Sequence, residues 1–181
     1  MIDQTQVQAL QHRLAGEQEI YALLDGAALP NLLALLSEHR LTHCCLLPGE
    51  LEPELVIAAP YLVQLPAGCA FLELFLMQGL GRHWGILATT DADFRTLRMH
   101  LRQFLSVWDP NGQPLFFRYY DPRVLRIYLP TCQADELHTL FGPVTAFYAE
   151  SADADTIIRF TVADTGLGQQ PLSLAQPGAA T

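Results

Sequence analysis

The chain has 181 residues and carries ten arginines and lysines against nineteen acidic residues, a formal net charge of −9. This charge argues against a nucleic-acid backbone or an anionic membrane as the main ligand, because either would require a basic face. Half of the residues are hydrophobic and only 16% are charged, so one domain can fill its core and still keep apolar surface for a partner. The expected ligand is therefore a protein or a small molecule.

The basic residues are all arginines. The absence of lysine excludes a Schiff-base lysine, a lysine general base and the lysine of a phosphate-binding loop. The spacing of Cys44, Cys45, Cys69 and Cys132 fits neither a zinc motif nor a disulfide framework, so we expect reduced core residues. The sequence begins without the pattern of a secretory signal, and its apolar stretches are shorter than the roughly 20 residues of a membrane-spanning helix. We therefore expect a cytoplasmic protein.

The first half of the chain alternates short apolar runs with stretches of helical periodicity. Glycine and proline separate these segments, for example at Pro48-Gly49. The expected elements are helices over 5–15, 29–36 and 69–79 and strands over 20–24, 42–47, 61–65 and 84–89. The acidic stretch 50–54 is expected to begin a further helix or loop.

The second half adds hairpins. Asn111-Gly112 lies between the apolar runs Val107-Trp108 and Leu115–Arg118, and such a turn is a strong signal for a β-hairpin. Thr90, with Asp93 three residues later, resembles the capping box of a helix. The expected elements are helices over 93–105, 122–129 and 134–140 and a closing antiparallel pair of strands over 144–149 and 156–163.

These elements predict an α/β fold, a single domain with a mixed β-sheet covered by helices. The domain is expected to span residues 1–165. Residues 166–181 contain few large apolar side chains among their glycines, glutamines, alanines and prolines. Such a composition buries too little surface to fold, so these residues are predicted to form a flexible C-terminal tail.

The segment Phe116–Leu125, FFRYYDPRVL, concentrates charge between an aromatic strand and a helix. Asp121 suits the N-cap of this helix, and Pro122 suits its first position, where the missing N–H costs nothing. In a structural interpretation, Arg118 or Arg123 pairs with a carboxylate and holds the fold. In a functional interpretation, the two arginines contact a partner. The residues alone leave both interpretations open.

Two further groups of side chains are candidates for partner binding. Three arginines share one face of the helix over 93–105, namely Arg95, Arg98 and Arg102. Guanidinium groups pair well with carboxylates, so this stripe either docks an acidic surface or forms a solvated helix face. Tyr119 and Tyr120 are of a residue type enriched in binding hot spots, and they equally suit the rim of a sheet.

Enzymatic chemistry has one candidate cluster. His39, His43, Cys44 and Cys45 lie within seven residues, and imidazole and thiolate are good zinc ligands. Neighbouring residues of a strand point to opposite faces, however, so a shared ion would require a distorted turn. A small metal-dependent or hydrolytic enzyme that uses the His39–Cys45 cluster is the alternative function.

Other catalytic signals are weak. No serine lies in the glycine-flanked turn of a nucleophile elbow, and Asp25-Gly26 is explained by a turn at the end of a strand. We therefore expect no catalytic residue, no metal and no cofactor.

Five motifs occur in a characteristic order and spacing. They are YALLDGA at 21–27, APYLVQL at 59–65, WGIL at 84–87, HLRQFL at 100–105 and DPNGQPLFFRYYDPRVL at 109–125. Over roughly residues 20–148 the chain resembles the effector-adaptor chaperones of bacterial type VI secretion, the Tap or Tec proteins.

The resemblance implies a protein that binds one toxic effector in the cytoplasm and helps to load it onto the secretion spike, without catalysis. The implied partners are the secreted effector and the spike protein, with no nucleic acid and no membrane. Arg118, Asp121 and Arg123 match the family pattern in place. Because many relatives continue into a larger helical part, we expect this chain either to recognise its cargo with the core domain or residues 150–181, or to need a second protein for recognition.

Overall fold

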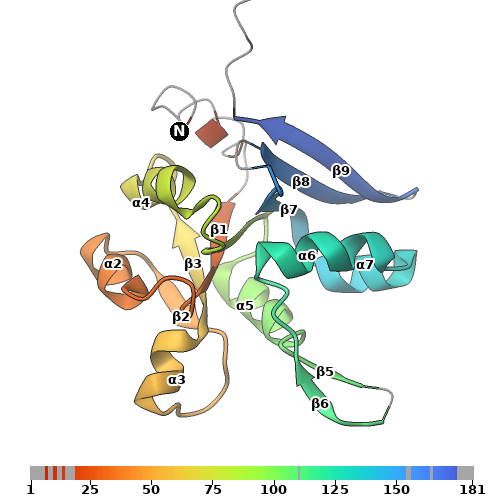
Figure 1. Cartoon of the computed structure of the whole chain (residues 1–181), viewed down its shortest axis with the longest axis horizontal. Helices are drawn as coiled ribbons and strands as arrows, with labels where there is room; N and C mark the ends of the chain where they lie inside the picture. The colour runs from red at the N-terminus through yellow and green to blue at the C-terminus, as the bar shows by residue number, and fades with distance from the viewer. Residues whose placement is uncertain are drawn as a thin grey trace, which may run out of the picture.

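A computed structural model describes residues 19–109, 111–153, 156–163 and 165–174, together with residues 7, 10, 11 and 14. Its strands are β1 (Glu19–Asp25), β2 (His43–Cys45), β3 (Pro60–Leu65), β4 (Gly85–Thr90), β5 (Ser106–Trp108), β6 (Pro114–Phe116), β7 (Val144–Glu150), β8 (Thr156–Ala163) and β9 (Gly166–Ser173). A seven-stranded sheet has the order β2-β3-β1-β4-β7-β8-β9, and β5 pairs with β6 in a separate hairpin (Figure 1).

The helices lie between the strands in the sequence. They are α2 (Leu32–Glu38), α3 (Pro53–Ala58), α4 (Ala70–Leu74), α5 (Phe94–Arg102), α6 (Pro122–Tyr128) and α7 (Ala134–Phe141). A π-helical turn, Phe75–Gly79, continues α4, and a 3-10 turn, Leu129–Thr131, continues α6. Among the described residues, no helix has the length and apolar character needed to cross a membrane.

The predicted α/β fold with a helix-covered sheet and a closing antiparallel pair is confirmed. The sheet is more uniform than a mixed one, because each neighbouring pair of strands is antiparallel. The first two strands along the chain, β1 and β2, do not pair with each other. The strand β3 lies between them and runs antiparallel to both. The predicted hairpin is also confirmed as the pair β5 and β6.

Two hydrophobic cores lie on the two faces of the sheet. On β1, Ile20, Ala22 and Leu24 belong to one core, and Tyr21 and Leu23 belong to the other, as the alternation of a strand requires. Side chains of α2 and α4 complete the first core, and side chains of α5, α6 and α7 complete the second. β1 is therefore buried on both faces, and its polar end at Asp25 must be accommodated inside the protein.

The prediction of a flexible tail over 166–181 is wrong for its first half. Residues Gly166–Ser173 form β9, which pairs with β8 along its whole length. The composition suggested too little buried surface for folding. The segment is nevertheless ordered, because it forms backbone hydrogen bonds with β8 and buries Leu172 and Leu174. The last part of the predicted tail, 175–181, lies outside the described residues.

Two local predictions near helix starts need comment. The cap of α5 is Asp93, whose carboxylate accepts a hydrogen bond from Thr96 N at 2.7 Å, so the predicted capping box with Thr90 at its head is wrong. Thr90 instead belongs to β4, and its hydroxyl donates to Pro143 O. The helix expected over 5–15 falls largely outside the described residues, although Val7, Leu10 and Leu14 are buried in the first core.

Gly26 provides a test of the packing at the end of β1. A Cβ atom there would lie 2.4 Å from the carbonyl oxygen of Ile57 and 2.7 Å from that of Ala59. Because backbone atoms cannot move aside cheaply, Gly26→Ala should lower the free energy of unfolding by about 3 kcal/mol, measured by urea denaturation. Gly112→Ala is the control, since its φ of 75° costs only about 1 kcal/mol and its Cβ meets open space. Equal losses in the two variants would contradict the close approach.

Candidate functional site

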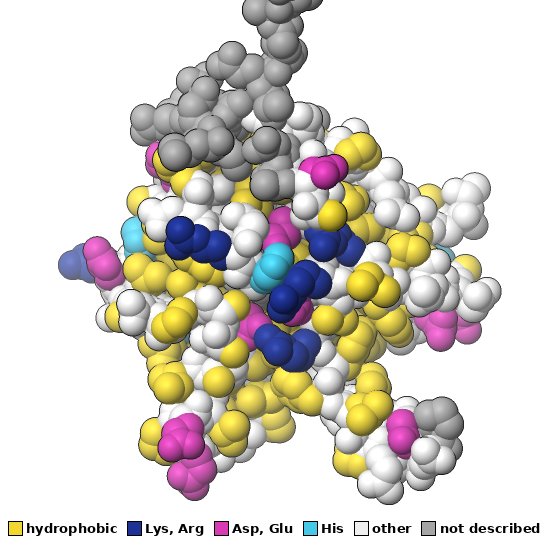
Figure 2. All heavy atoms as spheres, in the orientation of Figure 1, with side chains coloured by type: hydrophobic (Ala, Val, Ile, Leu, Met, Phe, Trp, Pro, Cys, Tyr) yellow, Lys and Arg dark blue, Asp and Glu magenta, His cyan; other side chains and the backbone are white. Residues whose placement is uncertain are grey.

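Three buried carboxylates gather at one end of the sheet. Asp25 ends β1, Glu150 ends β7 and Asp121 precedes α6, with exposures of 1%, 5% and 3%. Since β1 and β7 both run antiparallel to β4, their ends meet where β4 begins. Figure 2 shows acidic, basic and histidine side chains clustered in the middle of the face at this end. A buried carboxylate requires a cation or several hydrogen bonds, so the partners of these three groups define the site.

Asp25 is held by the turn that follows it and by Arg118. Its carboxylate accepts a hydrogen bond from Ala27 N at 3.0 Å and forms an ion pair with the Arg118 guanidinium. The same guanidinium lies 6.0 Å from the centre of the Tyr120 ring. Burial and the Asp25 charge raise the pKa of Tyr120 to about 12, so this phenol stays neutral beside the pair. The predicted strand-end turn at Asp25-Gly26 is present, and it also presents the carboxylate to Arg118.

Asp121 caps α6 and binds the guanidinium group of Arg123 through two of its nitrogen atoms. Its Oδ1 accepts from the Arg123 backbone N–H at 2.9 Å and from Arg123 Nε at 3.0 Å, and Oδ2 accepts from Arg123 Nη2 at 2.7 Å. Although burial raises the pKa of Asp121, the hydrogen bonds and charge of Arg123 outweigh it, and the pKa lies below its usual range. The predicted N-cap at Asp121 and first-turn proline at Pro122 are both confirmed.

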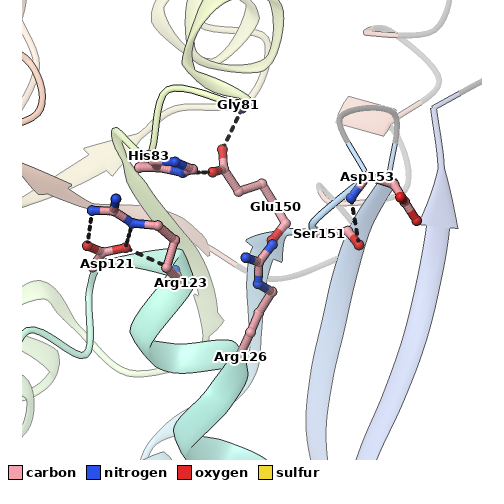
Figure 3. A network of polar contacts seen from close by, with 8 residues as sticks. All are labelled: Gly81, His83, Asp121, Arg123, Arg126, Glu150, Ser151 and Asp153. Atoms are coloured by element: carbon pink, nitrogen blue, oxygen red, sulfur yellow. Dashed lines mark hydrogen bonds and ion pairs between the residues drawn. The ribbon is translucent and has the colours of Figure 1, made fainter.

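Glu150 collects three further contacts (Figure 3). Its carboxylate accepts from the His83 ring nitrogen Nδ1 and, at 2.7 Å, from Gly81 N, while its backbone carbonyl accepts from Arg126 Nη1 at 2.6 Å. His83 has a φ of 59°, in the left-handed region that few non-glycine residues adopt. Sequence analysis missed His83, Glu150 and Arg126. The sequence gives little sign of a shared site beyond the places of these residues in the predicted elements. His83 precedes β4, Glu150 ends β7, and Arg126 lies on α6.

The side chains that pair with the buried carboxylates are themselves partly exposed to solvent. The side chains of Arg118, Arg123 and His83 are 42%, 52% and 35% exposed, whereas their carboxylate partners are buried. A guanidinium has five N–H donors, more than these contacts occupy. The outer surface can therefore donate hydrogen bonds to a carboxylate of a partner, even though the chain as a whole is acidic.

Other predicted partner-binding residues lie elsewhere. Tyr119 and Tyr120 are buried in the second core, and Tyr119 OH donates to Leu101 O at 2.8 Å. Neither ring is exposed to solvent, and contact of these residues with a partner stays a prediction. Hydrophobic burial against α5 and α6 explains their position. The stripe on α5 divides into an exposed Arg95 and two half-buried arginines, Arg98 and Arg102.

Arg98 and Arg102 lie near β2. Burial raises the pKa of the Cys44 thiol, and the charges of these two arginines oppose that change. The Nε atom of Arg98 is buried and has no hydrogen-bond partner within the described part of the chain. No contact described for these arginines joins them to the network around Asp25, and their role in partner binding stays a prediction.

The His39–Cys45 cluster is divided by the sheet. Cys45 packs with the first core and Cys44 with the second, as their alternation on β2 predicts. The His43 ring contacts Leu41 O at 2.8 Å. Among the residues that the structure describes, no three histidine, cysteine or acidic side chains come close enough together to hold a metal ion.

Fold and site together define a small α/β domain whose one end combines buried carboxylates with exposed arginines. A family model described as a domain of unknown function, DUF4123, matches residues 20–139, and the chain belongs to this family. The family is associated with type VI secretion. No curated protein and no solved structure matches the chain. The matched region includes Asp25, Arg118 and Asp121 but ends before Glu150.

Removal of Arg118 tests the structural role of the first ion pair. Arg118→Ala leaves the Asp25 carboxylate buried without its cation and should lower the free energy of unfolding by about 2 kcal/mol. The value lies below that of a fully buried pair because Arg118 is 42% exposed. In urea denaturation, the double variant Asp25→Asn/Arg118→Ala should recover part of the loss. Unchanged stability in Arg118→Ala would show that the pair with Asp25 does not stabilise the fold.

The ion pair between Asp121 and Arg123 should make the stability of the protein depend on pH. The folded pKa of Asp121 is lowered, so its contribution is complete above about pH 4 and is lost as the pH falls through the folded pKa. Arg123→Ala should therefore melt about 2 °C below the wild type at pH 7. This difference should shrink in thermal melts as the pH is lowered to about 3. A difference independent of pH would show that the pair contributes nothing to folding.

Proposed function

We propose that this protein is a non-catalytic adaptor chaperone, which binds a type VI secretion effector in the cytoplasm and helps to load it onto the secretion spike. The observation that carries the proposal is membership of a family associated with type VI secretion. The partners are accordingly the effector and a spike protein, without nucleic acid or membrane.

The charge arrangement supports a binding role over catalysis. Each of the three buried carboxylates has a side-chain partner, Arg118, Arg123 or His83, so none stands alone as a general acid or base. The exposed sides of the two arginines suit recognition of carboxylates on another protein.

The apolar surface also supports a protein partner. Large hydrophobic side chains are exposed on α3 and on the β5–β6 hairpin, namely Leu55, Ile57, Val107, Trp108, Leu115 and Phe116. Burial of such groups supplies affinity in protein interfaces, and flanking charges select the partner and its orientation.

The test is co-expression with the toxin-like protein encoded beside this chain, followed by affinity capture and size-exclusion chromatography with light scattering. We expect a stoichiometric complex and an effector that is insoluble or degraded when it is expressed alone. A spike protein of the secretion apparatus is tested in the same way. Absence of a complex with either protein would refute the adaptor function, and metal analysis of untagged protein would then test the alternative enzyme.

A further inference from the structure

A cleft of about 300 Å³ lies between α3 and the β5–β6 hairpin. Its lining is almost entirely apolar and consists of Leu47, Leu55, Ala58, Ala59, Pro60 and Phe116. In Figure 1, α3 and the hairpin project side by side from the same end of the molecule. Figure 2 shows hydrophobic side chains along the recess between these two projections.

The two walls of the cleft, α3 and the β5–β6 hairpin, bury few of their own side chains against the rest of the protein. No residue of α3 is buried, and Leu55 is 53% exposed. The hairpin is a separate two-stranded sheet, all six strand residues of which are exposed. An isolated two-stranded hairpin is at best marginally stable in water. Both walls would therefore gain buried apolar area from a partner that fills the cleft.

The inner end of the cleft adjoins the Asp25–Arg118 pair. Asp25 is the register partner of Pro60, and Gly26 N donates to Ala59 O at 3.0 Å, so two lining residues lie beside the end of β1. From the opposite wall, the Phe116 ring lies 6.5 Å from that of Tyr120, over which Arg118 is placed. A half-exposed guanidinium therefore stands next to apolar surface.

The outer end of the cleft carries the opposite charge. α3 leads into β3 at its C-terminal end, so its first turn, with Glu54 and the preceding Glu52, lies at the far end of the wall. Both glutamates are exposed, and Figure 2 shows acidic side chains at the tip of this projection. Charge thus changes along the cleft from acidic outside to basic inside. A ligand with a carboxylate is favoured in one orientation, with its negative end toward Arg118.

We propose that this cleft is the docking site for a segment of the effector in which a large apolar side chain is followed or preceded closely by an aspartate or glutamate. The apolar side chain enters between Leu55 and Phe116, and the carboxylate accepts hydrogen bonds from Arg118. This assignment rests on the proposed adaptor function, and it adds the binding face and the chemistry of the bound segment.

Affinity measurements on cleft variants test the apolar part. Leu55→Ser and Phe116→Ser change side chains that are each 53% exposed, so both variants should fold with an unchanged melting temperature. Each should weaken binding of the co-encoded effector by about tenfold or more in isothermal titration calorimetry. The matched control is Ile127→Ser, which removes a similar apolar group that is 75% exposed on α6, outside the cleft. This control should bind as the wild type does.

Photo-crosslinking tests the chemistry of the bound segment. Benzoylphenylalanine at position 55 should crosslink to the effector in the complex, whereas the same group at position 127 should not. Mass spectrometry should place the crosslink within a few residues of an aspartate or glutamate. A crosslinked segment without a nearby acidic residue, or crosslinking from position 127 alone, would overturn the proposal.

The outcomes separate this proposal from the function on which it rests. A wild-type complex with undiminished affinity in Leu55→Ser and Phe116→Ser would overturn the docking site and leave the adaptor function standing. Failure of the wild-type protein to bind the effector would overturn both. Light scattering that shows a dimer of this chain, dissociated by Leu55→Ser, would assign the cleft to a second copy and would also overturn the proposal.

Discussion

The burial of three carboxylates at one end of the sheet is the constraint around which this end of the molecule is organised. A buried charge is tolerated only when it is paired, and breaking such a pair is costly. Asp25 and Arg118 are 93 residues apart, and His83 and Glu150 are 67 residues apart. The pairs therefore connect segments that are far apart in the sequence. They join β1, the entry to β4, the start of α6 and the end of β7.

The burial of these carboxylates also determines which charges lie on the surface at this end of the sheet. Because Asp25 and Asp121 lie inside, Arg118 and Arg123 lie outside them, and an acidic protein acquires a basic surface at the end of its sheet. Arg118 follows β6 and precedes α6, so its contact with Asp25 anchors one strand of the projecting hairpin to the sheet. Gly26, next to Asp25, packs directly against the carbonyl groups of Ile57 and Ala59 at the end of α3. The pair thus sets the inner boundary of the space between α3 and the hairpin.

Local signals in the sequence predicted local structure well. The cap at Asp121, the proline that follows it and the turn of the β5–β6 hairpin depend on residues within a few positions of one another. The identity of the carboxylate that binds Arg118 depends on strand order, and no short-range pattern encodes it. Tyr119 and Tyr120 are buried for the same reason, since α5 and α6 cover them only in the assembled fold. β9 escaped prediction because β8 supplies the hydrogen bonds that its own composition does not favour.

In the proposed docking site, the buried carboxylates contribute to stability, the exposed apolar side chains contribute to recognition, and Arg118 contributes to both. Asp25, Asp121 and Glu150 are buried, so their effect on a partner must pass through the side chains that they hold in place. Leu55 and Phe116 are exposed and contribute little to the folded core, so evolution can change them without loss of the fold. In the proposed adaptor, the buried carboxylates and their partners position a cleft whose exposed apolar walls can change without loss of the fold. If the proposed docking site is correct, substitutions on these exposed walls change the specificity for an effector at the least cost in stability.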